Sequence, residues 1–477
     1  MSNKSTHIIN IDSVELEKIN AVYFIGIGGI GMSALARYFH SKGKIVSGYD
    51  RMSTVLTQEL EASGITIHYE ENLEKISTNV QLVVYTPAIP NQNSELQYYF
   101  KNNYLVVKRS DVLQILTKNT FNICIAGTHG KTTISTMIAH VLRHSGYGCN
   151  AFLGGISVNY KTNFWSSNNE VCVIEADEYD RSFLKLFPDV AIISSTDADH
   201  LDIYGTAQEV EKAFIDFSKN VKTGGLLVYK FGLKNSKEFS AKQSQSYCLN
   251  NNQSDVYVNN IKIEDGGYRF DVVVCGRLIK NFTLHMGGMH NVENAVAAIA
   301  TASYLKIDDD LIRNAIDCFK GVKRRFEYVL NTSKIIQIDD YAHHPEELTA
   351  LINGAKTLFS SKKCTLIFQP HLFSRTKDFA DAFAAALDLA DEVILLPIYP
   401  ARELPIPGVE SEMLLSKMKN GNKKIMSKNE LLDAIATKNS NEFDNELGEV
   451  IITAGAGDID TIVTPLKQIL EKKYKSE

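Results

Sequence analysis

The chain contains no apolar run that approaches the roughly 20 residues of a membrane-spanning helix. Its first residues, MSNKSTHIINIDSVELEK, contain no apolar h-region of the kind found in secretory signals. No Cys-x-x-Cys pair occurs among the seven cysteines, which argues against a cysteine-rich zinc site. These absences predict a cytoplasmic protein without a membrane span, whose thiols are reduced and mostly buried.

The charge balance also excludes some partners. The formal net charge is −6, which offers little attraction to nucleic acid or to an anionic membrane, so we expect neither as a partner. The hydrophobic fraction of 44% and the charged fraction of 22% are those of an ordinary globular protein. A length of 477 residues is enough for about two to four domains.

Short apolar runs alternate with helix-like segments along three successive stretches, which we place at residues 1–117, 118–328 and 329–477. Such βα alternation predicts an α/β protein with parallel sheets and with ligands at the carboxyl ends of the strands. Between 226 and 285, Val-rich runs separated by Asn, Gly and Ser predict a small antiparallel sheet. The polar tract 233–253 predicts a loop.

The second stretch opens with Gly-Thr-His-Gly-Lys-Thr between a predicted strand and a predicted helix. Backbone N–H groups in such a turn bind phosphate, with Lys131 on the β- and γ-phosphates and the Thr132 hydroxyl on Mg²⁺. The commoner motif has Gly where this chain has Ile125, so the match is to a shorter variant. The predicted ATP-binding residues of the loop are Gly127, Thr128, His129, Gly130, Lys131, Thr132 and Thr133.

Polar residues follow two later apolar runs of this stretch. Residues 175–180 read Glu-Ala-Asp-Glu-Tyr-Asp, where crowded carboxylates favour a Mg²⁺ site with Glu175 as the best-placed ligand. A solvated acidic loop is the alternative. Residues 197–202 contain His200, which we interpret as a metal ligand or as a polar group near the transferring phosphate.

A second Gly-rich turn, Gly-Ile-Gly-Gly-Ile-Gly, follows the first apolar run, and Asp50 ends the next one. Alone, this pattern is a dinucleotide fingerprint, which would suit an NAD-dependent oxidoreductase. Because the same turn binds any diphosphate, it predicts only a second nucleotide-like ligand. The residues concerned are Gly26, Gly28, Gly29, Gly31 and Asp50.

The third stretch places four candidate side chains after two successive strands: His343, His344, His371 and Arg375. An arginine there is suited to bind a carboxylate through two parallel hydrogen bonds. Histidines at such an edge also serve as helix caps, and both interpretations stay open. The sequence Gly-Ala-Gly-Asp at 455–458 is either another phosphate turn or a tight strand–helix junction.

The ordered set of motifs resembles the Mur ligase family across nearly the whole chain. The matching segments are IGIGGIGMSALA at 25–36, GTHGKTT at 127–133, EADEYDRSFL at 175–184, DADHLD at 197–202, HNVENAVAA at 290–298, GVKRRFE at 321–327, DDYAHHPEE at 339–347 and FQPHLFSRT at 367–376.

This resemblance implies a Rossmann-like domain that binds the UDP part of the substrate, a central P-loop-type ATPase domain, and a Rossmann-like C-terminal domain that closes on them. The first Gly-rich turn would then hold uridine diphosphate rather than NAD, with Asp50 near the uridine. Adenine and ribose would contact His290, Asn291, Asn294, Arg325 and Asp340.

The first Gly-rich turn is similar to that of the family branch that adds L-alanine to UDP-N-acetylmuramate, in the synthesis of peptidoglycan precursors. The alternative branch, which attaches recovered murein tripeptide, usually carries a Thr-x-Met-Gly-type turn. The implied reaction uses ATP and passes through an acyl phosphate, with one Mg²⁺ held by Thr132 and Glu175 and a second Mg²⁺ near His200. Arg375 would anchor the alanine carboxylate, with His343 or His344 beside it. We expect a monomer or a weak homodimer. A nucleotide-binding protein without catalysis would not need these last residues.

Overall fold

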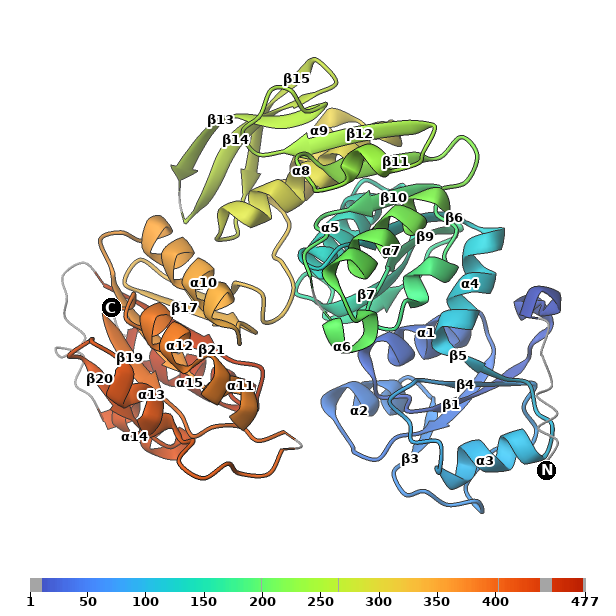
Figure 1. Cartoon of the computed structure of the whole chain (residues 1–477), viewed down its shortest axis with the longest axis horizontal. Helices are drawn as coiled ribbons and strands as arrows, with labels where there is room; N and C mark the ends of the chain where they lie inside the picture. Colours follow the sequence, from blue (N-terminus) through green and yellow to red (C-terminus); the bar gives the residue numbers. More distant parts are fainter. Residues whose placement is uncertain (1–10, 199, 265, 402, 438–447, 475–477) are drawn as a thin grey trace. The chain divides into compact units, whose positions relative to one another are not determined.

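The computed structural model describes residues 11–198, 200–264, 266–401, 403–437 and 448–474 (Figure 1). The chain forms two compact units. The first comprises residues 1–259, 272–280 and 293–316, and the second comprises residues 260–271, 281–292 and 317–477. None of the described helices is long and apolar enough to cross a membrane.

The N-terminal sheet has five parallel strands in the order β3-β2-β1-β4-β5. Every residue of β1, Ala-Val-Tyr-Phe-Ile, is buried, because a parallel strand in this fold is covered on both faces. The strands are β1 (Ala21–Ile25), β2 (Ile45–Tyr49), β3 (Thr66–His68), β4 (Leu82–Tyr85) and β5 (Val106–Lys108). The helices are α1 (Ile30–Ser41), α2 (Val55–Ala62), α3 (Ser94–Lys101) and α4 (Arg109–Asn119).

The central sheet has ten strands in the order β15-β14-β13-β12-β11-β10-β6-β9-β7-β8. β6 lies between β10 and β9 and pairs parallel with both, so three strand ends that carry candidate residues lie side by side. The strands are β6 (Phe121–Ala126), β7 (Asn150–Ser157), β8 (Thr162–Trp165), β9 (Val171–Glu175), β10 (Val190–Ile193), β11 (Leu226–Lys230), β12 (Gln243–Cys248), β13 (Val256–Glu264), β14 (Gly267–Val274) and β15 (Arg277–Leu284). The helices are α5 (Lys131–His144), α6 (Leu201–Tyr204), α7 (Ala207–Lys219), α8 (Met289–Tyr304) and α9 (Asp309–Asp317).

Two details of the 226–285 region differ from the prediction. β11 and β12 pair parallel, and they extend the central sheet instead of starting a separate antiparallel one. The tract 233–253, predicted as a loop, contains β12. The sequence did not predict this strand because most of its residues are polar. Tyr247 and Cys248 at its end are nevertheless buried. Both the backbone N–H and the hydroxyl of Ser246 donate to the Asp255 carboxylate at 2.7 Å.

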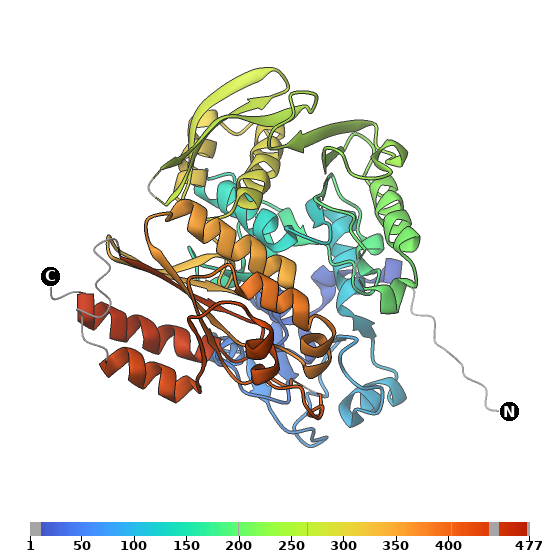
Figure 2. The same ribbon diagram turned by 60° about the vertical axis from the view of Figure 1, so that its left-hand side comes forward.

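The C-terminal sheet has six strands in the order β16-β17-β21-β18-β19-β20, and only the β16–β17 pair is antiparallel. Helices α10, α12 and α13 cover one face of this sheet, and α14 and α15 cover the other (Figure 2). Because successive side chains of a strand point to opposite faces, Ile336 of β17 packs in the first of these two apolar clusters and Ile335 in the second. The strands are β16 (Glu327–Asn331), β17 (Ile335–Asp340), β18 (Lys363–Phe368), β19 (Glu392–Leu395), β20 (Lys423–Ile425) and β21 (Glu449–Ala454). The helices are α10 (Pro345–Leu358), α11 (Phe373–Asp378), α12 (Ala380–Leu387), α13 (Ser411–Lys417), α14 (Lys428–Thr437) and α15 (Asp460–Tyr474). The predicted α/β class is confirmed.

Helix α1 is fastened to the central sheet through the β7–β8 hairpin. The fully buried Asn163 amide donates to the Ile30 carbonyl at 2.6 Å and to the Ser33 hydroxyl at 3.0 Å. The Tyr38 ring packs against Phe152 and Phe164, with ring centroids 5.4 and 6.2 Å away. The first turn of α1, which carries part of the first Gly-rich motif, is thereby held against the domain that carries the phosphate loop.

Replacing this amide should weaken the fold. We expect Asn163→Ala to lower the free energy of unfolding by about 1–3 kcal/mol, because two buried hydrogen bonds are lost. Urea denaturation followed by circular dichroism measures the change, with the exposed Asn252→Ala as the matched control. Equal stability of the two variants would show that this amide does not hold α1 in place.

Candidate active site

The phosphate loop depends on two glycines with positive φ. Gly127 has φ +135°, and a Cβ there would lie 2.2 Å from the Ser194 hydroxyl oxygen. Gly130 has φ +84° and precedes α5, and a Cβ there would lie 2.8 Å from Asn294 Oδ1. Only glycine fits both positions, so the loop stays open for a phosphate. The predicted ligand Asn294 thus lies beside the loop.

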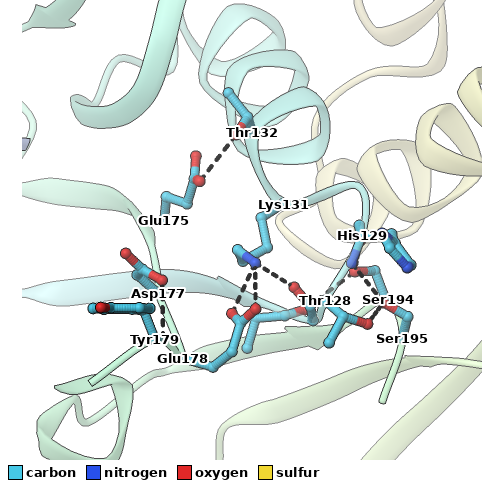
Figure 3. Close-up of polar contacts among 12 residues, drawn as sticks. Thr128, His129, Lys131, Thr132, Glu175, Asp177, Glu178, Tyr179, Ser194 and Ser195 are labelled. Carbon is cyan, nitrogen blue, oxygen red and sulfur yellow. Dashed lines mark hydrogen bonds and ion pairs between the residues drawn. The ribbon is translucent and has the colours of Figure 1, made fainter. Parts of the chain in front are cut away.

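Two serines that the sequence analysis did not select hold the loop from the side (Figure 3). The backbone N–H of His129 donates to Ser195 Oγ at 2.7 Å, and this oxygen lies 2.8 Å from Thr128 Oγ1. The Ser194 hydroxyl donates to the His129 carbonyl. Both serines directly follow β10, and the parallel pairing of β10 with β6 is the signal that would have found them.

Lys131 is bound to a buried carboxylate (Figure 3). Its Nζ donates to Glu178 Oε1 at 2.8 Å, lies 2.7 Å from Glu178 Oε2, and donates to the Gly127 carbonyl at 2.6 Å. The Glu178 side chain is only 1% exposed. Burial raises the pKa of Glu178, and the Lys131 charge opposes that shift. The motif 175–180 contains this residue, but the sequence alone favoured Glu175.

The structure brings together the predicted metal ligands Thr132 and Glu175. The Thr132 hydroxyl donates to Glu175 Oε1 at 2.9 Å, and the Gly154 N–H donates to Glu175 Oε2 at 3.0 Å. A hydroxyl and a carboxylate are the hard oxygen ligands that Mg²⁺ prefers, so this pair fits the ion. Over the described part of the chain, no group of three or more His, Cys, Asp or Glu side chains is arranged to hold a metal.

His200 precedes the short helix α6 and has φ +53°. Its ring meets the Tyr179 ring edge-on, with centroids 5.0 Å apart. Asp199, its neighbour in the motif, lies outside the described residues.

The first Gly-rich turn begins with Gly26, which has φ +84°. The N–H of Gly28 donates to Asp50 Oδ2 at 2.8 Å, so the Asp50 carboxylate holds the turn itself. Gly29 precedes α1, and Gly31 lies in its first turn. The turn has the form of an anion site at a helix N-terminus.

A cavity of about 380 Å³ extends from this turn to Glu175 at the end of β9. One end of it is lined by the residues 29–31, and its wall also includes Glu175, Asp177, Gly154 and Arg109. All of these residues belong to the first compact unit. The cavity therefore connects the first Gly-rich turn with Glu175, the carboxylate to which Thr132 of the phosphate loop donates.

In the second unit, His343, His371 and Arg375 form a cluster. The His343 and His371 ring centroids are 6.2 Å apart, and the Arg375 charge, with burial as the larger cause, lowers the pKa of both histidines. Arg375 Nη1 and His371 Nδ1 are buried, and neither has a hydrogen-bond partner within the described residues. Buried polar nitrogens without a protein partner are the groups that a bound ligand satisfies. His344 instead precedes α10, and its ring lies 4.8 Å from that of Phe379.

Two of the remaining predicted nucleotide contacts in the second unit, Asn291 and Asp340, form hydrogen bonds with backbone groups. Asn291 donates to the Gly287 carbonyl at 2.7 Å, and His290 stands beside it in the first turn of α8. The Asp340 carboxylate accepts from the N–H groups of Phe326 at 2.6 Å and Ala342 at 2.7 Å. Burial raises the pKa of Asp340 to about 6. Arg325, next to Phe326, is exposed, so Asp340 fixes the backbone that presents Arg325.

The turn 455–458 is a tight strand–helix junction. A Cβ on Gly455 would lie 2.6 Å from the Gln369 carbonyl oxygen, and one on Gly457 would lie 2.5 Å from Gln369 Oε1. The Gln369 side chain fills this turn and donates to Asp458 Oδ1 at 2.8 Å.

Comparisons with known proteins cover nearly the whole chain. Three family models match in succession: the Mur ligase family catalytic domain at residues 21–120, the Mur ligase middle domain at 125–302, and the Mur ligase glutamate ligase domain at 324–457. The chain is 46% identical over 463 residues to the UDP-N-acetylmuramate–L-alanine ligase of Flavobacterium johnsoniae, covering 96% of this chain and 100% of that one. It is 47% identical over 457 residues to the ligase of the same name from Porphyromonas gingivalis, covering 94% and 99%.

Among solved structures, the UDP-N-acetylmuramate–alanine ligase MurC of Thermotoga maritima superposes with a TM-score of 0.79 at 28% identity, covering 96% of this chain and 100% of that one. A murein peptide ligase from Psychrobacter arcticus shares the fold at 23% identity, with a TM-score of 0.64 over 94% of this chain and 98% of that one. The family predicted from the motifs is confirmed: the chain belongs to the Mur ligase family.

Proposed function

We propose that this enzyme joins L-alanine to the lactyl carboxylate of UDP-N-acetylmuramate, using ATP and releasing ADP and phosphate, in the synthesis of peptidoglycan precursors. The observation that carries the proposal is the cavity from the first Gly-rich turn to Glu175, beside the phosphate loop. It suits a substrate with a diphosphate at one end and a reacting carboxylate at the other. The two UDP-N-acetylmuramate–L-alanine ligases that are 46–47% identical to this chain over nearly its full length support it.

The first step transfers the γ-phosphoryl group of ATP to the lactyl carboxylate. Both reactants are anionic, so the site must neutralise charge before the carboxylate oxygen attacks phosphorus. Lys131 would do this at the β- and γ-phosphates, where it would exchange Glu178 for the nucleotide. Mg²⁺ would supply further positive charge there: Thr132 and Glu175 are the proposed ligands of one ion, and His200 is the proposed ligand of a second.

In the second step the alanine amine attacks the carbonyl carbon of the acyl phosphate. A C–N bond forms, the C–O bond to phosphate breaks, inorganic phosphate leaves and the amine loses a proton. Arg375 would bind the alanine carboxylate, because its buried Nη1 has no partner among the described residues. His343 would lie beside it, and His344 is the second candidate.

The adenosine part of ATP would contact the remaining predicted residues. Asn294 lies against the phosphate loop, which supports its role. The other proposed contacts are His290, Asn291, Arg325 and Asp340. An NAD-dependent oxidoreductase would leave Lys131 and its phosphate loop without a task.

Phosphate release from ATP in the presence of UDP-N-acetylmuramate, with and without L-alanine, tests the proposed function. Release should depend on both substrates, and mass spectrometry should find UDP-N-acetylmuramoyl-L-alanine. Release with L-alanyl-γ-D-glutamyl-diaminopimelate but not with L-alanine would replace the proposal with the tripeptide-ligating activity.

Arg375→Met should raise the KM for L-alanine by about 10- to 100-fold, because a charge-assisted hydrogen bond to the amino-acid carboxylate is lost. The KM for ATP should stay unchanged. Lys377→Met, an exposed cation on the same helix, is the matched control. An unaltered KM for L-alanine in Arg375→Met would remove Arg375 from this role.

Substitutions of Lys131 and Glu178 should have non-additive effects on the free energy of unfolding, whereas turnover should depend on Lys131 whether or not Glu178 is present. Lys131→Met leaves a buried carboxylate unpaired, which should cost on the order of 3 kcal/mol of unfolding free energy. Adding Glu178→Gln should recover much of that loss, because no charge then remains buried. Thermal unfolding of both single variants and the double variant gives the coupling energy.

The double variant should still show no turnover, because the cation at the phosphates is missing. Strictly additive stability effects, or turnover by Lys131→Met, would contradict the stated role of the pair.

A further inference from the structure

Arg109 lies against the first Gly-rich turn, although the motifs did not include it. It is the first residue of α4, and a Cβ built on Gly31 would lie 2.9 Å from Arg109 Nη1 and 3.3 Å from Cζ. The guanidinium therefore touches the first turn of α1, next to the backbone that the Gly-rich motif opens. α1 follows the first strand of the N-terminal sheet and α4 follows the last one, and the two helices meet at this point.

The Arg109 guanidinium has no hydrogen-bond or ion-pair partner among the described residues. The side chain is half-buried, and it takes part in none of the hydrogen bonds or ion pairs found across the described residues. Its neighbours are paired: Asp111 accepts from Lys185 at 2.5 Å and from the Lys108 N–H at 2.9 Å. A half-buried guanidinium has lost part of its hydration, and here no protein group compensates for that loss. An anionic ligand would supply the missing hydrogen bonds and the opposite charge.

The cavity shows where that ligand would lie. Arg109 is the only cation among the described residues that line it, and Glu175 and Asp177 in its wall are acidic. Its contact with Gly31 puts the guanidinium at the α1 end. The Gly-rich turn there offers N–H groups but no full positive charge, whereas a nucleoside diphosphate carries charge on both phosphates.

We propose that Arg109 binds the diphosphate of the nucleotide-sugar substrate and supplies the cation that the Gly-rich turn lacks. This inference rests on the proposed function, because it assigns one residue to the substrate named there. Arg109 is a binding residue and takes no part in the bond-making steps. Its fork of donors suits two oxygens of a phosphate, which a lysine ammonium does not match.

Calorimetric binding of UDP and of uridine tests the proposal without any need for turnover. Arg109→Met should weaken UDP binding by at least about tenfold and leave uridine binding unchanged, because only UDP carries the phosphates. Arg109→Lys should recover part of the affinity. Lys108→Met, which removes the adjacent exposed charge, should bind UDP like the unchanged protein.

In steady-state assays Arg109→Met should raise the KM for UDP-N-acetylmuramate by a similar factor, and the KM values for ATP and L-alanine should not change. An equal loss of all three, or a lower thermal midpoint than Lys108→Met, would indicate a structural role and overturn the inference.

The two proposals fail in different ways. Unaltered UDP binding by Arg109→Met would overturn the assignment of Arg109 while leaving the ligase activity in place. A rise in the KM for UDP-N-acetylmuramate without a loss of UDP affinity would move the contact to the sugar acid and also overturn it. Absence of UDP binding by the unchanged protein would contradict the diphosphate site itself.

Discussion

The order of three strands, β10-β6-β9, is the constraint on which the nucleotide site depends. Because these strands are parallel and adjacent, their carboxyl ends bring together side chains that are far apart in sequence. The end of β6 carries the phosphate loop, the end of β9 carries Glu175 and Glu178, and the end of β10 carries Ser195. The two positive-φ glycines then let the loop close against β10 without filling the space a phosphate needs.

The same principle extends to the second nucleotide-like turn. Asn163 and the aromatic contacts of Tyr38 fix α1 to the β7–β8 hairpin, and β7 lies beside β9 in the central sheet. The wall of the cavity therefore contains residues from the regions around both sheets. The first turn of α1 and Arg109 come from the N-terminal sheet region, and Gly154 and Glu175 come from the central sheet. A substrate that spans this cavity would contact α1 at one end and the central sheet at the other, and these two elements pack against each other.

The sequence predicted most of the architecture and the chemistry of the loops, since strand ends and Gly-rich turns have local signatures. It selected Glu175 as the metal ligand but not Glu178 as the partner of Lys131, because spacing alone does not show which carboxylate points to Lys131. Ser195 and Arg109 act through contacts with segments many residues away, so no local pattern marks them.

The error in β12 has a different cause. A strand of Gln and Ser has no apolar alternation, and its pairing with β11 comes from the sheet it extends. The histidines of the third stretch divide similarly: His344 takes the capping position that the sequence left open, and His371 joins the Arg375 cluster. In each case the deciding contact lies outside the local sequence window.

The β7–β8 hairpin also contains Trp165, the single tryptophan of the chain. Its indole is buried, meets the Tyr160 ring at 4.7 Å, and lies 5.5 Å from the Arg143 guanidinium. Two residues earlier, Asn163 holds the first turn of α1. Indole emission responds to nearby charge and polarity, and this single tryptophan lies on the strand that holds α1 against the central sheet. Tryptophan emission from one position therefore reports on the contact between α1 and the central sheet without an attached dye.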